Sequence, residues 1–217
     1  MRAIEARGLD QRYGSRTALA GIDLDVETGE AVAVLGENGS GKTTLLRILA
    51  TAARPAAGSL VILGLEARQH RESLRARIGY LAHAGGLYPA LTARENLEFY
   101  CDLYGIDRAR AGRVLDEVGL VAARRRRASE LSRGMQQRLA LGRSILHEPE
   151  ILLLDEPDAG LDETGRDLLG RLARGRTLLL ATHDVELANR LCGREVRLAD
   201  GRLPVKPGSS GLVGTSR

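Results

Sequence analysis

A single glycine-rich turn constrains the fold of this chain more than any other feature. Residues Gly36–Thr43 read Gly-Glu-Asn-Gly-Ser-Gly-Lys-Thr and fit the pattern G-x-x-x-x-G-K-[ST] without a gap. An apolar run, residues 30–35, precedes the turn, and a helical pattern of apolar residues, 44–49, follows it. Glycines let successive backbone N–H groups point into one concavity at a helix N-terminus, where they bind an anion. The sequence therefore predicts a strand, a phosphate-binding turn and a helix in succession.

The chemistry of this turn indicates which residues hold the phosphates. The ammonium of Lys42 can reach the β- and γ-phosphates of a nucleotide, and the hydroxyl of Thr43 can bind Mg²⁺. The chain has only one other lysine, Lys206, among its 32 basic residues, so a lysine in the turn indicates a place where a compact cation has to fit. The alternative is a glycine-rich turn that binds no ligand. The candidate ATP-binding residues here are Gly36, Asn38, Gly39, Ser40, Gly41, Lys42, Thr43 and Thr44.

A second apolar run ends in two acidic residues. Residues 151–154 read Ile-Leu-Leu-Leu and are followed by Asp155 and Glu156. A nucleotide site needs a carboxylate for the metal and a group that activates water. We expect Asp155 to hold Mg²⁺ and Glu156 to act as the general base. Many strands end in acidic residues, so this feature gains its meaning from the phosphate-binding turn that precedes it.

The order of elements predicts an α/β protein with a helical insertion. A chain of 217 residues suits one large domain or one domain with an insertion. We expect an ATP-binding core with a β subdomain over residues 1–91 and 147–206, a helical subdomain over 92–146, and a tail of linker composition over 207–217, either flexible or a cloning remnant. The predicted strands are residues 3–9, 22–27, 30–35, 60–63, 151–154 and 177–180, followed by a small hairpin of Glu195–Leu198 and Arg202–Val205.

Composition narrows the partners and the compartment. Only 3% of the residues are aromatic and there is no Trp, which argues against a stacking surface for single-stranded nucleic acid, so we expect no nucleic-acid partner. The start has no apolar signal segment, and no stretch approaches the ~20 apolar residues of a transmembrane helix. Cys101 and Cys192 lack metal-ligand spacing and indicate reduced thiols. We expect a cytoplasmic protein that reaches a membrane only through a partner.

One dense run of positive charge interrupts an otherwise even distribution. Arg124–Arg127 are four consecutive arginines in a chain of net charge +4. Such a run can face phosphate or anionic lipid, and it can equally be a solvated helix end or loop. The sequence favours the solvated loop, and the other interpretation stays open.

A third motif narrows the class of nucleotide-binding protein. Leu131–Arg138 read Leu-Ser-Arg-Gly-Met-Gln-Gln-Arg, which resembles the signature of the ABC (ATP-binding cassette) family, usually L-S-G-G-Q. The resemblance covers nearly the whole chain. It implies that Tyr13 stacks on adenine, that Asp162 belongs to the D-loop, and that His183 is the switch histidine that contacts the γ-phosphate and so belongs, with Glu156, to the catalytic residues.

The resemblance also implies an assembly and an activity. Its fold is a P-loop NTPase of ABC type, with a mixed core sheet, an antiparallel β subdomain and a helical insertion. Its activity is ATP hydrolysis with Mg²⁺, and its usual partners are a second ATP-binding subunit and a transmembrane permease at the cytoplasmic face of the cell membrane. In this family the signature meets ATP from the neighbouring chain. The residues expected to do so are Ser132, Arg133, Gly134 and Met135.

Three departures from the family pattern carry information. Arg133 and Met135 replace the middle Gly and the Gln of the usual signature, and Asp158 stands where a small or hydroxyl residue is more usual. His83 occupies the place of the Q-loop glutamine and is either a tolerated variant or a catalytic group that titrates near neutral pH. Together with the residues around it, His83 is similar to the ATP-binding subunit of the haem exporter of cytochrome c maturation. The resemblance implies haem export.

Other functions stay possible at this point. The cargo of an ABC transporter is chosen by its membrane subunits, so export of another small molecule, lipid or drug is the main alternative. A soluble ABC ATPase of DNA repair would carry long coiled-coil arms between the turn and the signature, and fewer than a hundred residues separate them here. A degenerate, inactive cassette conflicts with the presence of Lys42, Asp155, Glu156 and His183.

Overall fold

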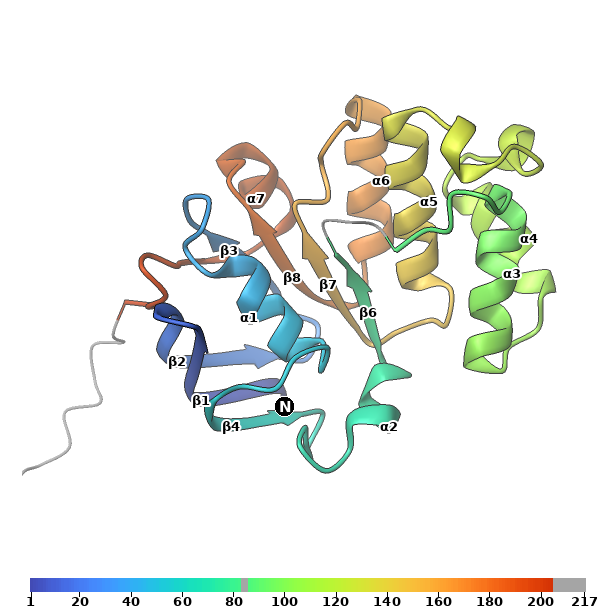
Figure 1. Ribbon diagram of the computed structural model, residues 1–217. Coiled ribbons are helices and arrows are strands. Elements are labelled where there is room, and N and C mark those ends of the chain that lie inside the picture. The colour runs from blue at the N-terminus through green and yellow to red at the C-terminus, as the bar shows by residue number, and fades with distance from the viewer. Residues whose placement is uncertain (83–85, 205–217) are drawn as a thin grey trace, which may run out of the picture.

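The strands of the protein divide between two sheets in the structure, a computed structural model that describes residues 1–82 and 86–204 (Figure 1). An antiparallel sheet has the strand order β2-β1-β4-β5, and a parallel sheet has the order β6-β7-β8-β3-β9. The expected α/β class is confirmed. The core sheet, which we expected to be mixed, is parallel across its five described strands, because the antiparallel strands form a sheet of their own.

Alternation of buried and exposed side chains builds the antiparallel sheet. Along β1, Ile4 and Ala6 are buried whereas Arg7 is exposed on the other side, as period-two patterning requires. A register shift between Ala6 and Leu9 lets Leu9 face the core as well. The paired strands β1 and β2 each continue well beyond the short segments predicted from sequence. The bounds are β1 Arg2–Tyr13, β2 Arg16–Glu27, β4 Ala57–Ile62 and β5 Leu65–Glu66.

Nearly continuous apolar runs form the central strands of the parallel sheet, which are buried on both faces. Every residue of β7 and of β8 is buried. Successive side chains of β7 face opposite cores: Leu153 belongs to the cluster that contains α1, and Leu152 belongs to the cluster formed with the helical insertion. The bounds are β3 Ala31–Leu35, β6 Ile78–Leu81, β7 Ile151–Asp155, β8 Thr177–Thr182 and β9 Arg194–Arg197.

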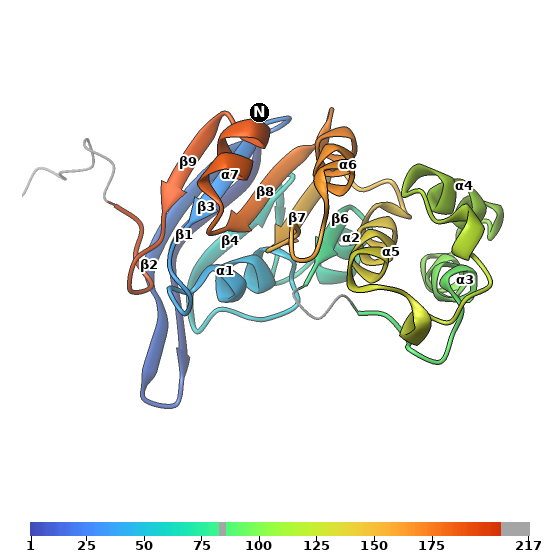
Figure 2. The same ribbon diagram turned by 90° about the horizontal axis from the view of Figure 1, so that it is seen from above.

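The helices cover the two faces of the parallel sheet. Helix α1 (Lys42–Leu49) lies between the two sheets, with Leu45 and Leu49 in the same core as Ile4 (Figures 1 and 2). Helix α6 (Glu163–Ala173) places Leu168 and Leu169 in the other core. Two short helices complete this part of the fold, α2 (Arg71–Arg75) and α7 (Val185–Leu191).

The segment expected to be helical contains helices and no strand in its described residues. It comprises α3 (Ala93–Tyr104), α4 (Ala109–Glu117) and α5 (Arg133–Ile145), and it lies at the end of the molecule far from the antiparallel sheet (Figure 2). Its apolar side chains share one core with β7 and β8, so the division at residues 92–146 stays a prediction. Among the described helices none is long and apolar enough to cross a membrane.

The closing hairpin was predicted wrongly. Residues 194–197 instead form β9, which pairs in parallel with β3, with Glu195 opposite Ala33. The expected turn at Asp200 and Gly201 is present, with positive φ at both residues, but it joins only one isolated antiparallel bridge, Ala199 to Arg202. β9 forms four residue pairs with β3 at the edge of the core sheet. Val205 lies outside the described residues.

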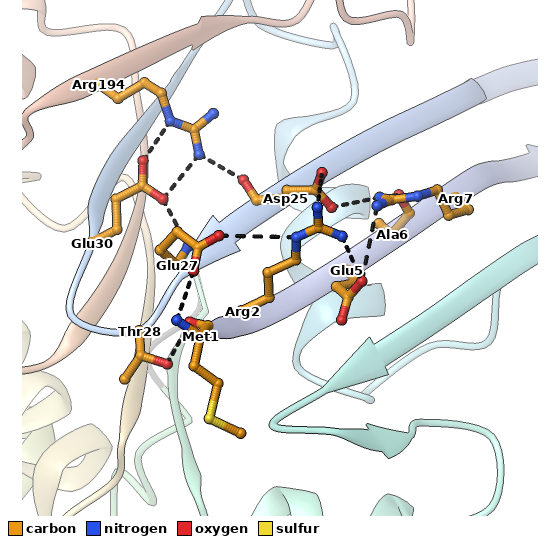
Figure 3. Close-up of polar contacts among 10 residues, drawn as sticks. All are labelled: Met1, Arg2, Glu5, Ala6, Arg7, Asp25, Glu27, Thr28, Glu30 and Arg194. Atoms are coloured by element: carbon orange, nitrogen blue, oxygen red, sulfur yellow. Dashed lines mark hydrogen bonds and ion pairs between the residues drawn. The ribbon is translucent and has the colours of Figure 1, made fainter. Parts of the chain in front are cut away.

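A network of charged groups joins the antiparallel sheet to the edge of the core sheet (Figure 3). Arg194 of β9 donates from Nε to Glu30 (2.6 Å) and from Nη2 to the Asp25 carbonyl of β2 (2.6 Å). The N-terminal amine lies 3.1 Å from a carboxylate oxygen of Glu27. Because the groups in this network remain partly exposed, each pair contributes about 1 kcal/mol or less, and the network serves mainly to fix the relative position of the sheets.

Candidate nucleotide site

The predicted phosphate-binding turn connects the end of β3 to the start of α1. Gly41 precedes the helix with φ of 111°, a conformation that residues with a side chain rarely adopt. A Cβ at Gly41 would lie 2.4 Å from the Ala18 carbonyl oxygen, and one at Gly36 would lie 2.4 Å from the Leu198 carbonyl oxygen. Close backbone approach therefore requires glycine at both positions, and backbone conformation requires it at Gly41 as well.

Lys42 points back across the turn. Its side chain is only 6% exposed, and Nζ donates to the carbonyl oxygens of Gly36 (2.7 Å) and Glu37 (3.1 Å). Ser40 is also buried, and its Oγ has no hydrogen-bond partner among the described residues. A buried hydroxyl without a partner beside a curled lysine fits a turn shaped to receive phosphate oxygens.

An open cavity of about 440 Å³ lies over the turn. Tyr13, the last residue of β1, stands at this cavity with its side chain half exposed. Most of the sequence-predicted ATP-binding residues line the cavity, while Gly36 and Ser40 belong to the turn beside it. The lining residues are Tyr13, Arg16, Ala18, Asn38, Gly39, Gly41, Lys42, Thr43, Thr44 and Glu156.

Arg16 is a cavity residue that the sequence analysis missed. It is paired with Tyr13 across the tight turn between β1 and β2, and its Nη2 donates to the Gly39 carbonyl at 2.9 Å. The signal was available in principle. Tyr13 and Arg16 face each other where β1 turns into β2. A cation at position 16 can therefore reach a nucleotide whose adenine lies on Tyr13.

Glu156 is the point at which three separate segments meet. It follows β7 with φ of 49° and donates its backbone N–H to the Ala181 carbonyl of β8 at 2.8 Å. One carboxylate oxygen lies 3.5 Å from Nζ of Lys42, and the other lies 2.7 Å from Nδ1 of His183. The structure thus brings together the predicted base, the predicted switch histidine and the lysine of the turn.

Asp155 is almost completely buried at the end of β7, at 1% exposure. Burial, with a smaller contribution from the charge of Asp155, raises the pKa of Tyr80 to about 12. In the described residues no group of three or more His, Cys, Asp or Glu side chains could hold a metal by itself. One buried carboxylate and the Thr43 hydroxyl instead suit Mg²⁺, which is usually held by one or two protein groups, phosphates and water.

The signature residues lie away from this cavity. Ser132 caps α5 by accepting from the Met135 backbone N–H at 3.3 Å, and Arg133 is exposed on the first turn. A Cβ at Gly134 would lie 2.7 Å from the Gly160 carbonyl oxygen, so this glycine allows α5 to rest on the segment after Glu156. None of the four signature residues lines the cavity of the same chain.

Two further positions have local roles. Asp162 caps α6 by accepting from the Gly165 backbone N–H at 2.9 Å, so the structure gives it a capping role and leaves its D-loop role a prediction. Asp158 is half-buried and its Oδ1 has no hydrogen-bond partner among the described residues, which nothing in the structure explains. The predicted Q-loop residue His83 lies outside the described residues.

Comparison with known proteins places this geometry among ABC proteins. The ABC transporter family model matches residues 19–159. The Nod factor export ATP-binding protein I of Paraburkholderia xenovorans (strain LB400) is 37% identical over 97% of this chain and 72% of its own length. The daunorubicin resistance ATP-binding protein DrrA3 of Streptomyces coeruleorubidus is 39% identical over 93% of this chain and 66% of its own length.

Solved structures agree with this match. The dimeric structure of MJ0796, a bacterial ABC transporter cassette, superimposes with a TM-score of 0.86 at 28% identity, over 93% of this chain and 97% of that one. A second dimeric MJ0796 structure, of a post-hydrolysis state bound to ADP and Pi, has a TM-score of 0.84 over the same shares of the two chains.

Proposed function

This chain belongs to the ABC transporter family as an ATP-hydrolysing cassette, and we propose that it is the ATP-driven subunit of a small-molecule exporter in a cell membrane. The observation that carries the ATP-driven part of the proposal is that Lys42 and Glu156 line one cavity and that His183 contacts Glu156 beside it. These groups come from three distant segments of the chain, and a binding module without hydrolysis would not need the carboxylate among them.

The nucleotide is expected to bind by replacing contacts that the turn now makes with itself. ATP phosphates compete with the carbonyls of Gly36 and Glu37 for the Lys42 ammonium, and backbone N–H groups of the turn complete the anion site. Tyr13, exposed at the mouth of the cavity, offers a ring face to the adenine. Asp155 and Thr43 would hold Mg²⁺, whose charge stabilises the transferring phosphoryl group.

Hydrolysis needs a base that is free to accept a proton from water. Glu156 is shared between Lys42 and His183, and phosphate binding would draw Lys42 toward the ligand. The remaining contact with His183 then holds the carboxylate in place while it takes the proton. His183 is largely exposed, with 69% of its side-chain surface accessible, so it is also free to contact a phosphate from the open side of the cavity.

The signature points to a second copy of the chain. Because Ser132, Arg133, Gly134 and Met135 do not line their own cavity, we propose that they complete the cavity of a partner cassette, with two ATP molecules between the chains. The support for this is the exposed cap at Ser132 and the likeness to a cassette solved as a dimer.

An aromatic cluster offers a docking face for the permease. Tyr88, Phe99 and Tyr100 pack edge to face or tilted, and Tyr88 and Phe99 remain 45% and 40% exposed. Phe99 and Tyr100 lie on α3 of the helical insertion, and Tyr88 lies in the segment that leads into it, so a partner docked here would be displaced when the cassette moves. Through this contact the chain would lie at the cytoplasmic face of the membrane.

For the cargo, the relatives favour export of another small molecule, lipid or drug over export of haem. The two relatives are named for export of Nod factor and for daunorubicin resistance, and neither name refers to haem or cytochrome c. We therefore propose export of a lipid-like or drug-like small molecule and set haem export aside.

The test is a co-purification from gently solubilised membranes of the source organism. Glu156→Gln loaded with Mg-ATP should retain a polytopic permease, identified by mass spectrometry. A Phe99→Ser variant in the same background should lose that permease and still bind ATP, because Phe99 is remote from the cavity. Recovery of only soluble proteins with both chains would leave an ATPase without a membrane role.

A further inference from the structure

A loop of four arginines lies outside the nucleotide site and has no role in it. Arg124–Arg127, here termed the arginine loop, join the 3-10 turns Val121–Ala123 and Ala128–Glu130, and all four side chains are exposed. No member of the loop forms an ion pair with a carboxylate in the part of the chain that the structure describes. Like charges on four consecutive residues repel one another, so the loop keeps a positive charge that an anionic partner could meet.

The backbone of the loop is fixed although its side chains are exposed. The loop runs beside the segment that leads into α3, with Ala93 N–H donating to the Arg126 carbonyl (2.9 Å) and Arg94 N–H to the Arg124 carbonyl (3.0 Å). These bonds hold the four residues as one ordered edge. An anionic partner could therefore bind the four arginines without paying the entropic cost of ordering their backbone.

Nearby acidic groups neutralise the loop only partly. Glu95 lies close enough for the charge of Arg127 to contribute to its lowered pKa, but its carboxylate accepts the Thr92 N–H at 2.8 Å. Glu130 likewise accepts the Arg127 backbone N–H at 3.2 Å. Both carboxylates keep their negative charge in these bonds, but two carboxylates beside four guanidinium groups leave the loop with a net positive charge.

The loop borders the proposed permease-docking face. It is bonded to the segment after Tyr88, through Ala128 N–H to the Leu91 carbonyl (2.8 Å) and through the bridge between Thr92 and Arg127. Val121, at the start of the same turn, is 42% exposed. Charge, an exposed aliphatic side chain and an aromatic cluster thus lie on neighbouring segments, which is the combination found at membrane interfaces.

We propose that the arginine loop binds the phosphate headgroups of anionic phospholipids when the cassette is held against a membrane. Guanidinium groups match phosphate oxygens in a bidentate geometry. The choice of a membrane over a nucleic acid rests on the proposed function, which brings this face next to a membrane protein. In this way the loop would orient the cassette, because it adds a second contact beside the permease.

The test is flotation of the purified full chain with vesicles. We expect binding to vesicles that contain phosphatidylglycerol in phosphatidylcholine, little binding to phosphatidylcholine alone, and weaker binding as salt screens the charges. Arg124→Gln/Arg125→Gln should lower partitioning at least tenfold, since each arginine near an anionic surface contributes about 1 kcal/mol. These two arginines are chosen because the Arg124 side chain makes one bond, to the Val121 carbonyl, and that of Arg125 makes none within the described residues.

A charge-matched control distinguishes the loop from overall charge. Arg54→Gln/Arg68→Gln removes two arginines that also form no ion pair within the described chain, and it should leave partitioning nearly unchanged. Equal loss with both double variants, or equal binding to neutral vesicles, would overturn the proposal. So would tighter binding of a short single-stranded RNA through Arg124 and Arg125.

Failure of this proposal is separable from failure of the proposed function. Neither arginine touches the nucleotide cavity, so ATP hydrolysis of the double variant in solution should equal that of the original chain. Loss of vesicle binding with intact hydrolysis supports the lipid contact, whereas absence of hydrolysis in the unsubstituted chain would count against the ATPase itself.

Discussion

At the scale of single residues, the contacts of Lys42 explain how the turn keeps its shape. The ammonium is buried and bonded to two carbonyl oxygens of the turn, with a carboxylate 3.5 Å away. A buried cation must be compensated, and here the groups that compensate it are those a phosphate would replace. The same residue therefore stabilises the turn and prepares it for the ligand.

Lys42→Ala should abolish ATP binding. The change removes the one cation buried within the turn, and alanine cannot replace its contact with the terminal phosphates. Titration with a fluorescent ATP analogue should show a loss of at least about 100-fold in affinity, the scale of two or more charge-assisted hydrogen bonds. Unchanged affinity in a variant with normal circular dichroism would rule out this turn as the phosphate site.

Glu156→Gln should separate binding from hydrolysis. The amide keeps the size of the side chain and loses its basicity, and general bases contribute about 10²- to 10⁴-fold to rate. The variant should bind ATP at least as tightly as the original chain, because a negative charge near the phosphates is removed, and should hydrolyse it more slowly by that factor. The matched control is Glu117→Gln, the same chemical change at a residue that does not line the cavity and pairs with Arg110. Hydrolysis at the original rate would mean that another group is the base.

At the scale of elements, the start of α3 shows how local sequence positions the helix that carries Phe99 and Tyr100. Thr92 accepts from the Glu95 N–H (3.2 Å) while Glu95 accepts from the Thr92 N–H (2.8 Å), which makes a reciprocal capping box. The helix ends at Gly105, with φ of 66°. These two signals fix the length of the helix that carries Phe99 and Tyr100.

Glu95→Gln should change how stability depends on pH. The backbone N–H of Thr92 and its hydroxyl lower the pKa of Glu95 in the folded chain below its ordinary 4.5. A carboxylate with a lowered folded pKa stabilises above its unfolded pKa, and this contribution is lost as pH falls through the folded value. The original chain should therefore exceed the variant in unfolding free energy at pH 7, and the difference should shrink below about pH 4.5 in urea titrations. If the difference in unfolding free energy stays the same across this pH range, the charge of Glu95 does not cause it, and the effect comes from the shape of the cap.

The sequence was sufficient for elements defined by strong periodicity and insufficient for those defined by distant pairing. The apolar runs of β3, β7 and β8 and the helical insertion were predicted because burial on both faces and helical spacing leave a local pattern. The partner of β9 was missed, since parallel pairing with β3 joins residues more than 150 positions apart. Short elements such as β5, α2 and α7 were also missed, because a few residues carry too little pattern.

The same limit applies to the candidate site. Lys42 and Glu156 were predictable at the cavity because the motif of each adjoins a strand end, and parallel strands bring their carboxyl ends to one edge of the sheet. The metal-binding role of Asp155 stays a prediction. Arg16 was not, since it reaches the cavity through the geometry of a hairpin. Ser132 is an exposed cap of α5 and does not line the cavity of its own chain, so the chain alone does not show what the signature binds.

At the scale of the whole molecule, the cavity and the signature lie at separate places on the surface of the chain. The cavity opens between the end of β1 and the turn before α1, and the signature caps α5 on the other side of β7 (Figure 1). A single chain therefore presents two different surfaces, the cavity and the signature, that could each form half of a site. A pair of chains related by a two-fold axis would complete both sites at once, because each chain offers its signature to the cavity of the other.

This arrangement predicts that two defective chains repair each other. In a Glu156→Gln background, Lys42→Ala destroys the cavity half and Ser132→Arg destroys the signature half, so neither chain alone should dimerise with Mg-ATP. A mixture contains a pair in which one site joins an intact Lys42 to an intact Ser132, while the opposite site carries both defects.

Light scattering should therefore detect dimers only in the mixture and only with Mg-ATP, with the Glu156→Gln chain as the positive control. In the proposed dimer each ATP is held by Lys42 of one chain and Ser132 of the other. Mixing can therefore restore dimers only if cavity and signature belong to different chains. Dimers formed by Ser132→Arg alone would show that the signature is not needed for the interface. Monomers in the mixture, where the Glu156→Gln control dimerises, would count against a pair held by the cavity of one chain and the signature of the other.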